Sequence, residues 1–209
     1  MSEDKTTTLL LIRHAHNPLL DQRRLGGWTP DVHLSERGRA EAQALGARLV
    51  KTSISAVYSS PLERAFETAE YVAGPHGLTV QVVDGLGESH CGEWTGRPVE
   101  EVVQTDLWRQ FQLLPSAARF PGGESIVEMQ ARLVAALETI RAAHPGQTVA
   151  VFSHSDPLKS ALAHYMGIAL DLFQRLVISP ASLTELAFTR LGPRLMRCND
   201  CAHIPEPGA

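Results

Sequence analysis

The chain of 209 residues is poor in cysteine, with Cys91, Cys198 and Cys201 as its only thiols. So few cysteines, in an odd number, provide no disulfide framework and favour a reducing, cytoplasmic setting. Cys198 and Cys201 have C-x-x-C spacing, but a zinc site needs about four ligands and the sequence has no second close pair. We therefore expect incidental thiols, and neither a metal site nor a redox centre.

The sequence also lacks long hydrophobic runs and clusters of basic residues. No apolar stretch approaches the roughly 20 residues that a membrane-spanning helix needs, and residues 1–5 are too polar for a signal peptide. The 19 basic and 23 acidic residues leave a formal net charge of −4, without a basic arm. These features argue against nucleic acid and membranes as partners and predict a cytoplasmic protein. The sequence leaves open whether the protein is a monomer or a homodimer.

Short apolar runs alternate with helical patterns along the whole chain. We expect strands at residues 7–12, 56–58, 79–83, 148–152, 177–179, 183–188 and 195–198. Helices are expected at 35–52, 61–73, 98–111, 125–144 and 156–166, with Ser35 and a capping box of Ser125 and Glu128 as start signals. The alternation predicts an α/β fold, a three-layer α/β/α sandwich around a mostly parallel sheet. Residues 1–209 would form one domain, with a small helical insertion or lid at about 97–125 and a disordered tail at 204–209.

Two of the predicted buried strands end in a histidine. Arg13 and His14 end the first strand, and His154 ends the fourth. Ligands bind beyond the carboxyl ends of parallel strands, so neighbouring strands would place both histidines in one crevice. Arg64 lies in the first turn of the second helix, where backbone N–H groups already favour anions. Because the planar fork of arginine matches phosphate oxygens, these four groups predict a phosphate site with His14 as a candidate nucleophile.

Several short segments accompany these residues in a fixed order along the chain. They are Leu11-Ile12-Arg13-His14-Ala15, Leu34-Ser35-Glu36-Arg37-Gly38, Ser59-Ser60-Pro61-Leu62-Glu63-Arg64-Ala65 with Thr68-Ala69, Leu86-Gly87-Glu88 with Gly92-Glu93-Trp94-Thr95-Gly96, Pro121-Gly122-Gly123-Glu124-Ser125, Ser153-His154, and Asn199-Asp200 with His203. Together they resemble the motifs of the histidine phosphatase superfamily, also called phosphoglycerate mutase-like. The resemblance covers nearly the whole chain and implies the phosphoglycerate mutase-like form of the predicted sandwich.

The resemblance implies an enzyme of the phosphatase branch that works through a covalent phosphohistidine. His14 would be the nucleophile, and Glu88 would be the general acid and then the general base. The phosphoryl oxygens would be bound and stabilised by Arg13, Arg64 and His154. No metal and no cofactor would be required, because the arginines supply the positive charge.

Several positions depart from the residues that are usual in the family. Ala15 stands where glycine is usual, His16 replaces Glu or Gln, and Leu20 stands where many members have a phosphate-contacting Asn. Asn17 would supply the missing amide donor. Further substrate contacts are expected from Gly27, Trp28 and Ser155. These departures keep the catalytic residues but limit how far a substrate can be transferred from known members.

The implied function is a cofactor-independent phosphomonoester hydrolase that acts on a small cytoplasmic phosphorylated metabolite. One alternative is phosphoryl transfer of the phosphoglycerate mutase type. A mutase must shield its phosphoenzyme from water, which usually involves more lid than 209 residues provide. The other alternative is a non-catalytic phosphate-binding or regulatory module on the same fold. Against that module, both arginines, both histidines and the acid are present.

Overall fold

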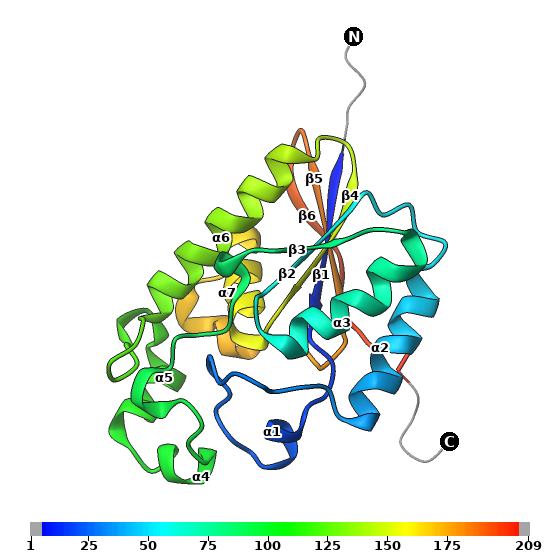
Figure 1. The fold of residues 1–209 in the computed structure, drawn as a ribbon. Helices are drawn as coiled ribbons and strands as arrows, with labels where there is room; N and C mark the ends of the chain where they lie inside the picture. The colour runs from blue at the N-terminus through cyan, green and yellow to red at the C-terminus, as the bar shows by residue number, and fades with distance from the viewer. Residues whose placement is uncertain (1–5, 205–209) are drawn as a thin grey trace.

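A computed structural model describes residues 6–204, and a six-stranded sheet forms the centre of this part of the chain (Figure 1). The strands are β1 (Thr7–Arg13), β2 (Ala56–Ser59), β3 (Val80–Val82), β4 (Thr148–Ser153), β5 (Leu183–Thr189) and β6 (Gly192–Asp200). Their order across the sheet is β3-β2-β4-β1-β5-β6. β1 to β4 run parallel, whereas β5 and β6 form an antiparallel hairpin beside β1. The predicted mostly parallel sheet is confirmed.

The central strand β1 is buried on both faces because its apolar side chains alternate between two cores. Leu9 and Leu11 join one core, and Leu10 and Ile12 join the other. A continuous apolar run is typical of a parallel strand that is covered on both faces. The register places Ile12 opposite Phe152, so β1 and β4 end at the same level of the sheet.

Helices cover both faces of the sheet (Figure 1). The helices are α1 (Pro18–Asp21), α2 (Glu36–Leu49), α3 (Glu63–Ala73), α4 (Val99–Val102), α5 (Asp106–Leu113), α6 (Ile126–Ala143) and α7 (Ser155–Met166). Short 3₁₀ helices occupy Gly74–His76, Asp84–Leu86, Gly92–Trp94, Pro115–Ala117 and Leu170–Arg175. α2 and α3 pack on one face through Leu45 and Val72, and α6 and α7 pack on the other through Leu133 and Leu158. This arrangement confirms the three-layer sandwich.

The segment 97–125, which is the predicted lid, lies at the carboxyl end of the sheet and contains α4 and α5 (Figure 1). An aromatic cluster joins Phe111 and Phe120 of this segment to Trp94, which precedes it, with 4.4 Å between the ring centroids of the two phenylalanines. The same cluster includes Ile126 and Met129 at the start of α6. The lid therefore packs on the main body of the protein through a shared apolar core.

The strand expected at 177–179 is a wrong prediction, because within residues 6–204 these three positions carry no strand. The carbonyl of Ile178 accepts a hydrogen bond from Arg13 Nη1 at 2.7 Å, and the N–H of Ser179 donates to Asn199 Oδ1 at 2.6 Å. Side chains thus satisfy backbone groups that a strand would pair with a neighbour.

Helix boundaries also differ in places from the predicted ones. The helix expected at 98–111 is split into α4 and α5, because the Thr105 side chain accepts the Trp108 N–H and starts a new helix. α1 lies inside a segment expected to be a loop, although Asn17 as N-cap and Pro18 in the first turn are helix start signals. α3 begins at Glu63, slightly later than expected.

The C-terminal end of the described chain packs on the body of the protein. Ile204, the first residue of the predicted disordered tail, contacts the apolar cluster of Ala15, Leu34, Ala42 and Ala181. The remainder of that predicted tail, 205–209, lies outside the described residues. Within residues 6–204, the structure contains no helix that is long and apolar enough to cross a membrane.

Candidate active site

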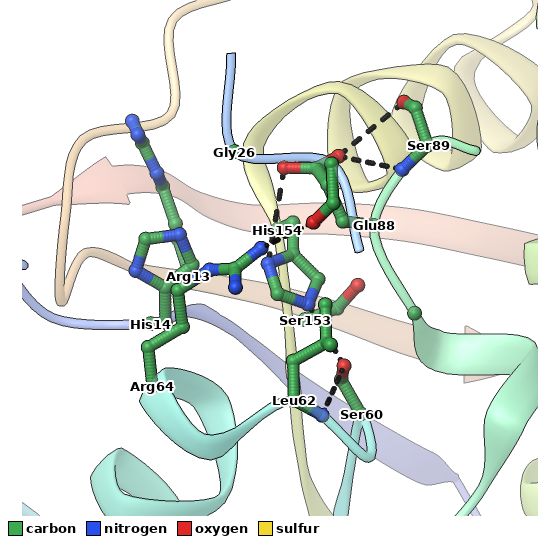
Figure 2. Close-up of polar contacts among 12 residues, drawn as sticks. Arg13, His14, Gly26, Ser60, Leu62, Arg64, Glu88, Ser89, Ser153 and His154 are labelled. Carbon is green, nitrogen blue, oxygen red and sulfur yellow. Dashed lines mark hydrogen bonds and ion pairs between the residues drawn. The ribbon is translucent and has the colours of Figure 1, made fainter. Parts of the chain in front are cut away.

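The ends of β1 and β4 bring the two predicted histidines together, as expected for neighbouring parallel strands (Figure 2). Arg13 pairs in register with Ser153, and the His14 N–H donates to the Ser153 carbonyl at 3.0 Å. The ring centroids of His14 and His154 are 5.1 Å apart. Both imidazoles are buried, although they come from positions far apart in the chain.

His14 is held in the form that a nucleophile needs. Its Nδ1 lies 2.7 Å from the carbonyl of Ala15, which can only accept a hydrogen bond, so Nδ1 carries the proton. Burial, and then the charges of Arg64 and Arg13, lower the pKa of His14 well below its usual value. The imidazole is therefore neutral at pH 7, and the lone pair of Nε2 is available to attack.

Two buried arginines flank His14. Arg13 Nη1 donates to the Ile178 carbonyl at 2.7 Å, and Arg64 Nη2 donates to the Gly27 carbonyl at 2.8 Å. These bonds anchor one side of each guanidinium. Burial lowers the pKa of both arginines, which means that each charge is held at a cost in solvation.

His154 presents a donor to the same place. Its Nε2 lies 2.8 Å from Ser60 Oγ, and that oxygen also accepts the Leu62 N–H at 3.3 Å (Figure 2). The Ser60 hydroxyl proton is then free to point at His154 Nε2, which places the ring proton on Nδ1. Nδ1 lies 3.8 Å from Glu88 Oε2. Ser60 thus positions His154, a role that depends on a contact between residues 94 positions apart and has no signal in the local sequence.

Several buried donors at this site have no hydrogen-bond partner within the described residues. They are Arg13 Nε, Arg64 Nη1 and His154 Nδ1. A buried donor without a partner costs about 1–3 kcal/mol, and more when the group is charged. An anion with several acceptor oxygens, such as a phosphoryl group, would accept hydrogen bonds from all three donors beside the neutral histidine.

Glu88 has the properties of a general acid. Ser89 donates to its Oε1 from the backbone N–H at 2.8 Å and from the hydroxyl at 3.3 Å (Figure 2). Burial, followed by the negative charge of Asp156, raises the pKa of Glu88. The protonated form therefore persists to higher pH than for an ordinary glutamate, as proton donation to a leaving group requires.

The segment that carries Glu88 is braced from α6. Arg132 donates to the carbonyls of Gly85, Gly87 and Glu88 at 3.0, 3.1 and 3.2 Å, and to Glu124 Oε1 at 2.7 Å. Glu124 in turn accepts a backbone N–H from the same segment. Arg132 was missing from the predicted site, because its role depends on carbonyls 44 to 47 residues away.

Replacing Arg132 with methionine is expected to lower kcat for alkyl phosphates by about 10-fold to 100-fold, because misplacing a catalytic group by about 1 Å can cost that much. Hydrolysis of p-nitrophenyl phosphate, whose leaving group needs no proton, should fall much less. The matched control is Arg141→Met on the same helix, where the arginine pairs with Glu138 instead. Equal losses on both substrates would show that Arg132 does not act through Glu88.

A cavity of about 190 Å³ opens over these residues. Its lining includes the predicted contacts Asn17, Gly27 and Ser155, and lid residues Trp108, Phe111, Gln112 and Phe120. Asn17 Nδ2 lies 3.4 Å from His14 Nδ1. Trp28, also predicted to touch substrate, is not among the lining residues and lies beside Gly87, where its Nε1 donates to the Glu88 carbonyl at 2.6 Å. Trp28 is therefore placed to position Glu88.

The remaining histidines and thiols have other surroundings. His16 is buried between Ser35 Oγ at 2.8 Å and Asp21 Oδ1 at 3.1 Å, which ties the loop after β1 to α1 and α2. Cys198 and Cys201 are free thiols. Within residues 6–204, no group of three or more histidine, cysteine, aspartate or glutamate side chains has the arrangement of a metal site.

Comparison with known proteins agrees with this geometry. The sequence model of the histidine phosphatase superfamily (branch 1) matches residues 9–201. Phosphoserine phosphatase 1 of Hydrogenobacter thermophilus is 32% identical over 200 residues, covering 95% of this chain and 94% of that protein. Phosphoglycerate mutase-like protein 4 of Arabidopsis thaliana is 32% identical over 157 residues, covering 73% of this chain and 68% of that protein. The structure of Bacillus stearothermophilus YhfR has a TM-score of 0.90 at 31% identity, covering 95% of this chain and all of that one. The chain belongs to the histidine phosphatase superfamily, and it is an enzyme of the phosphatase class.

Proposed function

We propose that the protein hydrolyses small phosphate monoesters in two steps, through a phosphohistidine on His14. The observation that carries this proposal is the set of unpaired buried donors of Arg13, Arg64 and His154 beside a neutral His14. The size of the cavity, about 190 Å³, suits a small metabolite, because sites for drug-sized ligands are roughly 300–1,000 Å³. A cytoplasmic metabolite remains the prediction from composition.

In the first step, the lone pair of His14 Nε2 attacks phosphorus and the ester P–O bond breaks. The carboxyl group of Glu88 gives its proton to the departing oxygen, and the alcohol leaves. Arg13, Arg64 and His154 donate hydrogen bonds to the other phosphoryl oxygens, whose charge spreads in the transition state. These positively charged and N–H groups supply the charge stabilisation, so the proposed chemistry draws on no metal and no cofactor.

In the second step, a water molecule gives a proton to the Glu88 carboxylate while its oxygen attacks phosphorus. The N–P bond breaks, and the bonding pair returns to His14 Nε2. Inorganic phosphate leaves, and both His14 and Glu88 recover their starting protonation states. One carboxyl group therefore serves as acid and then as base, and the covalent intermediate divides one difficult displacement into two.

A phosphoglycerate mutase reaction is the second candidate, and the Arabidopsis relative is the observation that favours it. The test is a pair of assays in the presence of a metal chelator. Release of inorganic phosphate from p-nitrophenyl phosphate and from alkyl phosphates is the expected result. Interconversion of 2- and 3-phosphoglycerate without phosphate release would establish the mutase instead. Retained phosphate binding with neither activity would establish a non-catalytic module and overturn the proposal.

A further inference from the structure

One wall of the catalytic cavity carries a carboxylate that the proposed mechanism does not use. Asp156, in the first turn of α7, lines the cavity together with Ser155 and Gln174. An anion in this position disfavours a negative group placed directly beside it, because like charges repel strongly where water is excluded. Lys159 is the ion-pair partner of Asp156 at 3.0 Å, and a carboxylate on this wall can distinguish phosphate esters by the charge of their alcohol part.

A network behind the cavity wall fixes the orientation of Asp156. Lys159 Nζ donates to Asp156 Oδ1 at 3.0 Å and to Gln174 Oε1 at 3.1 Å. Asp156 and Gln174 line the cavity, whereas Lys159 is not among its lining residues. Asp156 Oδ2 has a long contact of 3.5 Å from Gln174 Nε2. This second oxygen can accept a shorter hydrogen bond from a bound molecule.

The charge of Asp156 acts on the reaction centre. It is the strongest influence on Glu88 after burial, and it raises the pKa of that carboxyl group. It also raises the pKa of Arg13, which partly offsets the lowering caused by burial. Asp156 both lines the cavity and changes the pKa values of Glu88 and Arg13. These observations agree that its carboxylate lies close to the place where an ester would bind.

We propose that Asp156 selects phosphate esters whose alcohol part carries an ammonium group, that is, phosphates of amino alcohols and hydroxy amino acids. This inference rests on the proposed hydrolysis of phosphate monoesters. The ammonium group donates to Asp156 Oδ2 while the phosphoryl group occupies the donors of Arg13 and Arg64. Arg24, a cation that lines the same cavity, is placed to receive a carboxylate on esters that have one. Esters with a hydroxyl or a methyl group in place of the ammonium lack this charge-assisted bond.

Pairs of esters that differ at one group provide the test. In the first pair, O-phosphoserine carries an ammonium group where 3-phosphoglycerate carries a hydroxyl group. In the second pair, O-phosphoethanolamine carries an ammonium group where propyl phosphate carries a methyl group. We expect the native enzyme to favour the ammonium member of each pair in kcat/KM by at least about 10-fold. In Asp156→Asn, each ratio should fall by about 10-fold to 100-fold, the range for a hydrogen bond to a charged group.

The control variant is Asp106→Asn, which removes the same charge from the first turn of α5, at an exposed position outside the cavity lining. It should leave both ratios unchanged. Hydrolysis of p-nitrophenyl phosphate by each variant shows that it is folded, and the native ratios test the proposal even if Asp156→Asn does not fold. Native ratios near one, or an equal fall in both variants, would overturn the assignment of Asp156. Failure of the native enzyme on every ester, p-nitrophenyl phosphate included, would instead refute the proposed hydrolysis.

Discussion

Replacing His14 with alanine should abolish turnover, with kcat lowered by at least about 10⁴-fold, because no other group can take the place of the attacking nitrogen. The unpaired donors of Arg13, Arg64 and His154 remain in this variant. Binding of inorganic phosphate should therefore persist while chemistry stops. Separating binding from turnover in this way distinguishes loss of a nucleophile from loss of the site.

The covalent step has its own measurement. Acid-free denaturation of the native enzyme during turnover of a ³²P-labelled ester should trap a protein-bound phosphate that is stable to alkali, as expected for a phosphoramidate. His14→Ala should trap none. The matched control is His16→Asn, because His16 is also buried after β1 but contacts Ser35 and Asp21 and does not line the cavity. Trapped phosphate in His14→Ala would place the intermediate on another residue.

Replacing Glu88 with glutamine should lower kcat for alkyl phosphates by about 10²-fold to 10⁴-fold, the usual contribution of a general acid. Glutamine keeps the size and hydrogen-bonding atoms of the side chain but cannot give up a proton to an alkoxide. The first step with p-nitrophenyl phosphate should change little, because nitrophenolate leaves without protonation. A burst of nitrophenol followed by slow turnover is then expected, since the second step still needs a base. Equal loss of the nitrophenol burst would argue against Glu88 as the acid.

The pH dependence follows from the same carboxyl group. Burial and the charge of Asp156 raise the pKa of Glu88, so the protonated acid is present at low pH and is lost as pH rises through that raised value. We therefore expect kcat/KM for alkyl phosphates to decline on the alkaline side in the native enzyme. This decline should disappear in Glu88→Gln. The nucleophile sets the acid side, because the lowered pKa of His14 keeps it neutral until the pH is well below 6.5.

Hydrophobic pattern was enough to predict the sheet and its two helical layers. The run at Leu9–Ile12 has no polar alternation, and only a strand covered on both faces buries such a run. The capping box of Ser125 and Glu128 likewise forms as predicted. The strand expected at 177–179 does not form, for a reason that the hydrophobic pattern of the sequence does not reveal. Its backbone groups bond to side chains from distant segments.

The two histidines of the candidate site could be placed together from sequence because strand ends are local features and parallel strands align them. The geometry that activates them could not be predicted in this way. Ser60 sets the proton of His154 from 94 residues away, and Arg132 holds the Glu88 segment from another helix. The hydrogen bond from Trp28 Nε1 to the Glu88 carbonyl likewise joins segments 60 residues apart and could not be predicted from sequence.

The candidate site is therefore encoded in part by residue types at strand ends, where Arg13, His14 and His154 can be recognised without a structure. Protonation states, the orientation of Glu88 and the presence of Asp156 on the cavity wall depend on folding. The physical reason is that local sequence controls backbone conformation and burial, whereas hydrogen bonds and charge interactions depend on distances between segments. Those distances exist only after the sheet has formed and the lid has packed on α6.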